Sequence, residues 1–340
     1  MRWIKWGFTF FLVFFLKISW STPQQDSCLL KQLETADDST TIGVLKAVCQ
    51  TLNSVGQALP EPATPVIDTQ TEVTPTPSAL AQRIQLERQE TNPFSLLPHK
   101  PNYVILSNNI GTPNERPFNE AFPDKDTHLQ PWETKFQISF KVPVARDLFN
   151  KADLFVAYTN RSFFQQFNKD DSAPFRDSNH EPEVWLSFRN NAKVLGFQNR
   201  VIRTGFSHQS NGQSGSLSRS WNRVYVDFLL ERDNWYFSLK PWWRMSENND
   251  SDDNPDIDDF LGNFELSGLY KHKQHNFSFL VRNNLRSSDN HGAVELGWTF
   301  PISDNVRGYV QWFNGYGESL IDYDAHTNSL GFGIQLTDWL

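Results

Sequence analysis

Apolar and polar residues alternate with a period of two over many short segments in the last two thirds of the chain. Residues 135–142 read Lys-Phe-Gln-Ile-Ser-Phe-Lys-Val, so an extended strand places all four apolar side chains on one face. The same alternation recurs at 294–300, 306–312 and 330–337, and similar segments begin near residues 103, 152, 182, 198, 221, 234, 259 and 274. This pattern predicts about twelve antiparallel strands.

Two features favour a transmembrane β-barrel over a soluble β-sandwich, whose strands also alternate. The polar faces carry full charges, which pair across a polar lumen, at Lys135, Lys141, Asp227, Lys240, Glu265, Glu295 and Arg307. The last segment, 335–340, is expected to help close the sheet. Short turns at 230–234, 270–274 and 301–305 alternate with longer loops at 209–220, 244–258, 284–292 and 314–328, as barrels with short periplasmic turns require.

The N-terminal residues follow a different pattern. Residues 1–21 are typical of a signal peptide, because two basic residues precede an apolar run at 7–16 that is too short to span a membrane comfortably. Residues 22–98 are expected to form a periplasmic arm with a Pro/Thr-rich linker, and 99–340 the barrel domain. Cys28 and Cys49 either pair in an oxidising compartment or remain free thiols.

Composition narrows the class of protein. The chain has 28 Phe, 12 Trp and 8 Tyr, and aromatic side chains suit both strands and the girdles of a membrane barrel. Its low mean hydropathy argues against a helical membrane protein. The net charge of −8 gives no reason to expect nucleic acid as a partner.

Candidate chemistry lies between residues 205 and 223. His208 and Ser210 are two residues apart, so on a strand they share a face, and a serine hydroxyl needs such a neighbouring base to become a nucleophile. Residues 211–220 indicate a turn, after which Asn222 on the returning strand can orient the His208 ring. The alternative is a Ser/Asn/Gly loop that contains a histidine by chance.

The full motif resembles the signature of the outer membrane phospholipase A family of Gram-negative bacteria. The motif is His-Gln-Ser-Asn-Gly at 208–212 followed by Ser-Arg-Ser-Trp-Asn-Arg at 218–223. Further blocks that resemble the family lie, in its order, at 172–176, 179–182, 240–242, 252–257 and 315–323. The resemblance covers about residues 102–340. It implies a calcium-dependent outer-membrane enzyme that hydrolyses acyl esters of phospholipids and lysophospholipids, with A1 and A2 activity, as a homodimer.

The resemblance also implies roles for single residues. The backbone amide of Gly212 would hold the oxyanion, with calcium held by the Ser218 side chain, the Gln213 carbonyl and Ser172 of the partner subunit. Asp253 would attract calcium, although a solvated turn explains its acidic loop equally well. Asn160 would lie at the dimer interface. Gly215 stands where an acidic residue assists a second calcium site, which puts that second site in doubt.

The alternation predicts which way the candidate triad faces. Asn222 shares its face with Val224, Val226 and Phe228, and His208 shares its face with apolar residues of the preceding strand. The triad is therefore expected on the lipid-facing wall, where polar groups are costly unless they have a function. A channel or structural barrel with an incidental triad remains an alternative. A soluble serine esterase would need a Gly-x-Ser-x-Gly elbow, which the sequence lacks.

Overall fold

The computed structural model describes residues 77–90, 92, 95–125, 127–149, 151–169, 175–248, 252–303, 306–338 and 340. The predicted signal peptide, the two cysteines and most of the predicted arm and linker lie outside these residues.

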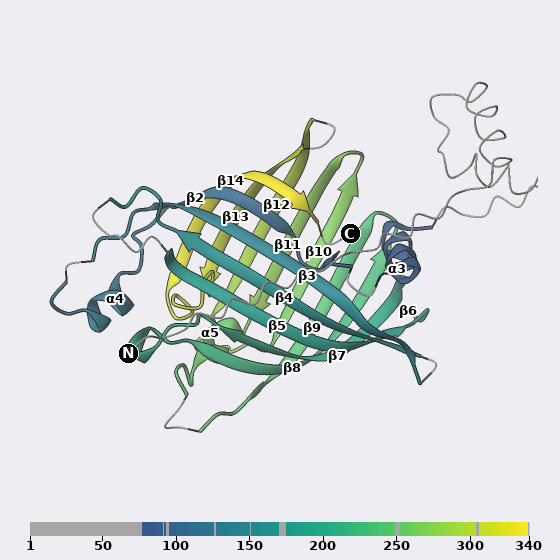
Figure 1. Cartoon of the computed structure of the whole chain (residues 1–340), viewed down its shortest axis with the longest axis horizontal. Helices are drawn as coiled ribbons and strands as arrows, with labels where there is room; N and C mark the ends of the chain where they lie inside the picture. Colours follow the sequence, from purple (N-terminus) through teal and green to yellow (C-terminus); the bar gives the residue numbers. More distant parts are fainter. Residues whose placement is uncertain are drawn as a thin grey trace, which may run out of the picture. The chain divides into compact units, whose positions relative to one another are not determined.

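Twelve antiparallel strands form a closed barrel (Figure 1). Each long strand pairs with its neighbours in sequence, and the last pairs with the first, which closes the ring. The strands are β2 (Asn102–Asn109), β3 (Trp132–Leu148), β4 (Ala152–Phe164), β5 (Phe175–Arg189), β7 (Phe197–Ser210), β8 (Ser220–Arg232), β9 (Trp235–Met245), β10 (Phe264–His272), β11 (His275–Asn283), β12 (Gly292–Ser303), β13 (Val306–Tyr316) and β14 (His326–Thr337). Two-residue strands, β1 (Leu97–Pro98) and β6 (Lys193–Val194), pair with β3 and β7. The predicted twelve-stranded fold is confirmed.

Two strands begin five or more residues away from the expected position. The segment expected from residue 259 begins at Phe264, because Ile257–Leu261 forms helix α5, whose first and last residues pack in a buried cluster with Trp221 and Trp242. Strand β5 begins seven residues before the expected residue 182. Its early inward side chains are polar, and Asp177 accepts a hydrogen bond from the backbone N–H of Ile321 at 3.0 Å. A search for apolar alternation therefore misses this part of the strand.

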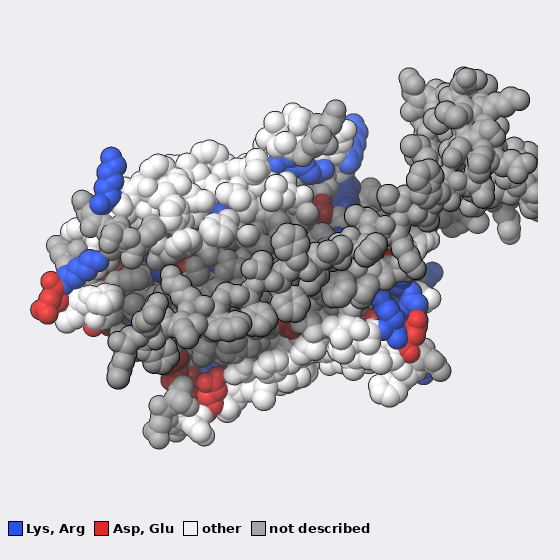
Figure 2. Space-filling view, viewed as in Figure 1, with Lys and Arg blue, Asp and Glu red and all other residues white. Residues whose placement is uncertain are grey.

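The two faces of the barrel wall have opposite character, as the alternation predicts. Lys135 is fully buried in the lumen, with its Nζ 3.0 Å from Glu318 Oε1. Outward apolar side chains such as Leu296 and Phe332 are 45% and 53% exposed. In Figure 2, the Lys, Arg, Asp and Glu side chains that can be seen lie mainly toward the two ends of the barrel, and the parts of the wall that grey atoms leave uncovered are largely white. The wall therefore offers an apolar surface outside and a charged interior.

Helix α3 (Ala79–Gln89) packs at the end of the barrel where the turns are short (Figure 1). Ser78 caps the helix N-terminus, and Leu80 packs in a buried cluster with Leu229 and Tyr236. The Glu87 carboxylate lies 2.8 Å from Lys141 Nζ. The helix falls within residues 22–98, the range that the sequence assigned to the arm and linker.

The longer connections gather at the opposite end, together with helices α4 (Arg116–Ala121) and α5 and the 3-10 turn η1 (Gly215–Leu217) (Figure 1). The described loops thus alternate in length as predicted. Within the described residues, every helix is too short or too polar to cross a membrane. The candidate triad lies where β7 and β8 reach the long-loop end.

Candidate active site

The pairing of β7 with β8 brings His208 and Asn222 together. They are directly opposite each other in the register, and His208 Nδ1 lies 2.9 Å from Asn222 Oδ1. Because the amide oxygen only accepts, Nδ1 carries the proton of the hydrogen bond and Nε2 is the free basic nitrogen. Asn222 thus stands where a residue that selects the histidine tautomer would stand.

All three side chains lie on the outer face of the barrel wall. The β8 residues that alternate with Asn222, among them Trp221 and Tyr225, are buried in the lumen, whereas Val224 on the same face as Asn222 is 41% exposed. On β7, Ser207 is buried inside, and His208 and Ser210 are half-buried outside. The wall therefore presents a polar group of three among apolar neighbours.

Ser210 is the last residue of β7 and shares the outward face with His208. Among the described residues, its hydroxyl makes no hydrogen bond, and neither does Nε2 of His208. The structure thus brings His208 and Asn222 into direct contact and places Ser210 beside them without a bond to His208. The Ser210 hydroxyl and Nε2 of His208 therefore both have an unused hydrogen-bonding position on the outer side of the barrel wall. Such gaps in a ligand-free triad commonly close when substrate binds.

The loop after Ser210 is held by Asn211, a buried residue that the sequence analysis did not single out. Its amide group donates to the Leu217 carbonyl at 2.9 Å and accepts from the Arg219 backbone N–H at 2.9 Å. Gly212 follows with a positive φ of 65°, a conformation that favours glycine. In the described part of the chain the Gly212 N–H donates no hydrogen bond, so it remains available near Ser210.

The predicted calcium ligands are only partly brought together. The Ser218 hydroxyl donates to Asp253 Oδ2 at 2.6 Å, and Gln213 is exposed in the same loop. Buried Asn254 fixes the acidic loop by accepting a hydrogen bond from the Ser220 N–H at 2.8 Å. Ser172 lies outside the described residues. Hydroxyl, carboxylate and carbonyl oxygens are the donors that calcium takes, so this set fits the ion. Over the described ranges, no three His, Cys, Asp or Glu residues form a cluster that could hold a metal.

Asn160 lies on the outer wall, two strands from Ser210. Its Nδ2 is 3.4 Å from His180 Nδ1, which also lies 2.6 Å from the Tyr158 hydroxyl. His180 is the register partner of Ser210 on β5. His180 lies in the block 179–182 that resembles the family, but apolar alternation assigns it no role, because its alternation with the inward residues Asn179 and Glu181 becomes visible only once β5 is known to start at Phe175.

One titratable group anchors the neighbouring loop 317–325. Burial, together with the hydrogen bond to Asp256, raises the pKa of Tyr323. Its neutral hydroxyl donates to Asp256 Oδ1 at 2.7 Å, and the Arg219 guanidinium lies 5.6 Å from the centre of its ring. These contacts tie the loop that contains Ser218 to the acidic loop that contains Asp253.

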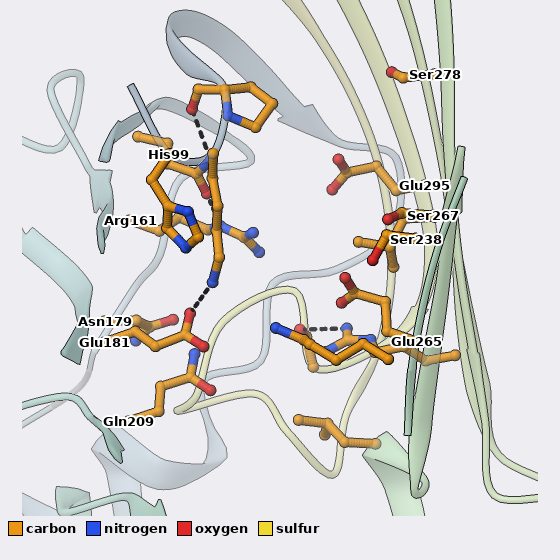
Figure 3. A pocket seen from close by; sticks show the side chains of 18 of the residues that line it. His99, Arg161, Asn179, Glu181, Gln209, Ser238, Glu265, Ser267, Ser278 and Glu295 are labelled. Carbon is orange, nitrogen blue, oxygen red and sulfur yellow. Dashed lines mark hydrogen bonds and ion pairs between the residues drawn. The ribbon is translucent and has the colours of Figure 1, made fainter. Parts of the chain in front are cut away.

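A cavity of about 190 Å³ lies inside the barrel, apart from the candidate triad. Figure 3 shows His99 and Arg161 on one side of it and Glu265 and Glu295 on the other. None of the three triad residues lines this cavity. The interior is thus a charged, hydrogen-bonded space separated by the wall from the group on the outer face.

Comparison with known proteins identifies relatives over most of the chain. Residues 80–336 match the family model described as Phospholipase A1. Phospholipase A1 of Escherichia coli strain K12 is 35% identical over 262 residues, which are 77% of this chain and 87% of that protein. A putative phospholipase A1 of Neisseria meningitidis is 38% identical over 259 residues, which are 74% and 65% of the two chains. The crystal structure of a Salmonella typhi outer membrane phospholipase dimer with bound calcium matches with a TM-score of 0.69 at 33% identity, and the match covers 76% of this chain and 98% of that one.

Proposed function

The chain belongs to the phospholipase A1 family, and from that premise we propose that it is a calcium-dependent outer-membrane phospholipase whose triad is His208, Ser210 and Asn222. Its substrates would be phospholipids and lysophospholipids. It would cleave their sn-1 and sn-2 acyl esters, which are A1 and A2 activity. The observation that carries the proposal is the hydrogen bond from His208 to Asn222 beside Ser210 on the outer wall.

The outward position defines how substrate arrives. A lipid with its acyl chains along the apolar wall would bring an ester carbonyl to Ser210 sideways, without entering the lumen. The site is at the long-loop end, which in an outer-membrane barrel faces the outer leaflet. The channel alternative has less support, because Lys135 and Glu318 pair across the described lumen and other charged side chains surround the cavity.

Hydrolysis would proceed through an acyl-enzyme. Ser210 Oγ attacks the ester carbonyl carbon while Nε2 of His208 takes the hydroxyl proton. Collapse of the tetrahedral intermediate breaks the bond to the lysophospholipid oxygen, which receives that proton from His208. Water, deprotonated by the same nitrogen, then attacks the carbonyl carbon of the acyl-Ser210 ester. The bond to Ser210 Oγ breaks, Oγ takes that proton from His208, and the fatty acid is released. Asn222 keeps Nδ1 protonated throughout, so Nε2 can exchange protons in both steps.

The oxyanion needs donors that are already in place. The Gly212 N–H has no partner among the described residues, which supports its assignment as one donor. Calcium would supply positive charge near the same oxygen, held by Ser218, the Gln213 carbonyl and Ser172 of the partner subunit, with Asp253 adding negative charge. The side chains of Ser218 and Asp253 are in contact, which supports this assignment. A site shared between subunits would make the homodimer the active state, with Asn160 at its interface.

The test is an assay of the purified full chain in detergent micelles that contain phosphatidylcholine. We expect fatty-acid release that requires calcium, stops on addition of a chelator, and is absent in Ser210→Ala. Asp289→Ala, a change in a different exposed loop, should leave the rate unaffected. Unchanged fatty-acid release by Ser210→Ala would overturn the proposal.

A further inference from the structure

The hydrogen-bonded chain that starts at His208 continues beyond Asn222. Asn222 Nδ2 donates to Glu247 Oε1 at 3.0 Å. Glu247 is half-buried two residues after the end of β9, whose last residue, Met245, is the register partner of Asn222. The structure therefore holds a linear array of carboxylate, amide and imidazole on the outer wall, of which only the last two belong to the assigned triad.

The Glu247 carboxylate determines which group donates and which accepts in each hydrogen bond of this array. An ionised carboxylate has acceptors only, so Glu247 must face the NH₂ group of Asn222, and the amide oxygen must face His208. His208 then donates from Nδ1 and keeps its lone pair on Nε2. With the amide reversed, its NH₂ would donate to Nδ1, the ring proton would move to Nε2, and the base would be lost.

An amide needs such a partner more than a carboxylate does. The two oxygens of an aspartate are equivalent, so an aspartate in a triad accepts from histidine in either orientation. The two ends of Asn222 have nearly the same shape and opposite hydrogen-bonding character. Packing alone therefore discriminates poorly between the productive amide and the reversed one, whereas a charge-assisted hydrogen bond discriminates strongly.

We propose that Glu247 is a positioning residue that fixes the Asn222 amide and, through it, the catalytic tautomer of His208. This inference rests on the proposed function and adds a fourth member to its machinery. Glu247 acts through Asn222, so its effect disappears when Asn222 is absent. In this array Asn222 separates the negative charge of Glu247 from the imidazole. The carboxylate lies at the rim of the wall, where it is easier to hydrate than among the acyl chains.

The test compares Glu247→Ala, Glu247→Gln, Asn222→Ala and the double variant Asn222→Ala/Glu247→Ala, with Glu120→Ala on helix α4 as a control for loss of an exposed glutamate. In phosphatidylcholine micelles at saturating calcium, Glu247→Ala should lower kcat about 3- to 10-fold with KM unchanged, a fraction of the contribution expected from a general base. Glu247→Gln should recover part of kcat, because its oxygen still accepts from Nδ2. The double variant should be no slower than Asn222→Ala.

A second readout does not depend on turnover. In protein labelled with ¹⁵N-histidine and assigned against His208→Ala, the Glu247→Ala change should raise the share of His208 in the Nε2-protonated tautomer. Wild-type kcat in Glu247→Ala, losses that multiply in the double variant, or a change only in the calcium concentration for half-maximal rate would each overturn the proposal. If the wild type itself fails to hydrolyse lipid, the proposed function fails, and the tautomer populations still decide the role of Glu247.

Discussion

The lumen of the barrel and the candidate site on its outer wall use polar residues in opposite ways. Inside, charged groups are buried and paired: Lys135 contacts both Glu318 and Gln311, and Glu318 also accepts a hydrogen bond from Ser329. Outside, the site consists of a hydroxyl, an imidazole and an amide, with Ser210 unbonded among the described residues. Polar groups that are hydrogen-bonded thus stabilise the barrel, whereas the outer groups that have no hydrogen-bond partner among the described residues remain free for substrate.

The largest expected effect comes from breaking a pair in the lumen. Lys135→Ala leaves Glu318 buried without its cation, which should lower the free energy of unfolding by about 3–5 kcal/mol. Thermal unfolding in detergent measures this change. Ser210→Ala on the outer wall should alter the same quantity by less than about 0.5 kcal/mol. Equal stability of the two variants would mean that the lumen network is not what holds the barrel.

The next-largest effect concerns the outer site, where we expect a substitution to change the rate of hydrolysis and not the stability of the barrel. Asn222→Ala removes the only hydrogen bond that Nδ1 of His208 makes in the described part of the chain. We expect kcat to fall about 10- to 100-fold as the wrong tautomer becomes populated. The unfolding temperature should not change. A loss of stability as large as that of Lys135→Ala would assign Asn222 to the framework and contradict a positioning role.

The sequence predicted the repeated features of the molecule better than the single contacts. Alternation gave the strand number and the outward face of Ser210, because a residue's face follows from its parity along a strand. It missed helix α3, whose one buried residue, Leu80, gives little helical periodicity, and it placed the start of β5 too late. Glu247 lies beyond the end of a strand, where parity no longer applies, so only the structure could bring it to Asn222.

A smaller effect tests the oxygen atoms that we assign as calcium ligands at the rim of the site. Ser218→Ala removes the hydroxyl that contacts Asp253 and that we assign to calcium. We expect about tenfold more calcium for half-maximal hydrolysis, with kcat at saturating calcium nearly restored. Titration of the hydrolysis rate with calcium measures the shift, and Asp289→Asn provides a control for loss of an exposed polar group. An unchanged calcium requirement would remove Ser218 from the ligand set.

The smallest effect concerns helix α3 and depends on pH. Burial by itself raises the pKa of Glu87, but the charges of Lys141 and Arg83 outweigh it and lower the pKa to about 2. A depressed pKa in the folded state stabilises docking of the helix above the ordinary value of 4.5, and this contribution is lost as the pH falls toward about 2. Hydrogen-exchange protection of the α3 amides should fall over that range. In Glu87→Gln, protection should already be low at neutral pH and should not follow this titration.

The central claim is that the hydrolytic groups open from the barrel wall toward hydrocarbon. The most direct measurement treats the calcium-loaded protein in micelles with a long-chain alkyl fluorophosphonate and maps the adduct by mass spectrometry. We expect one adduct, on Ser210, that forms faster than with a short, water-soluble analogue and disappears in His208→Ala. An adduct on another residue, or labelling of Ser210 that is equally fast with the short analogue and independent of His208, would contradict it.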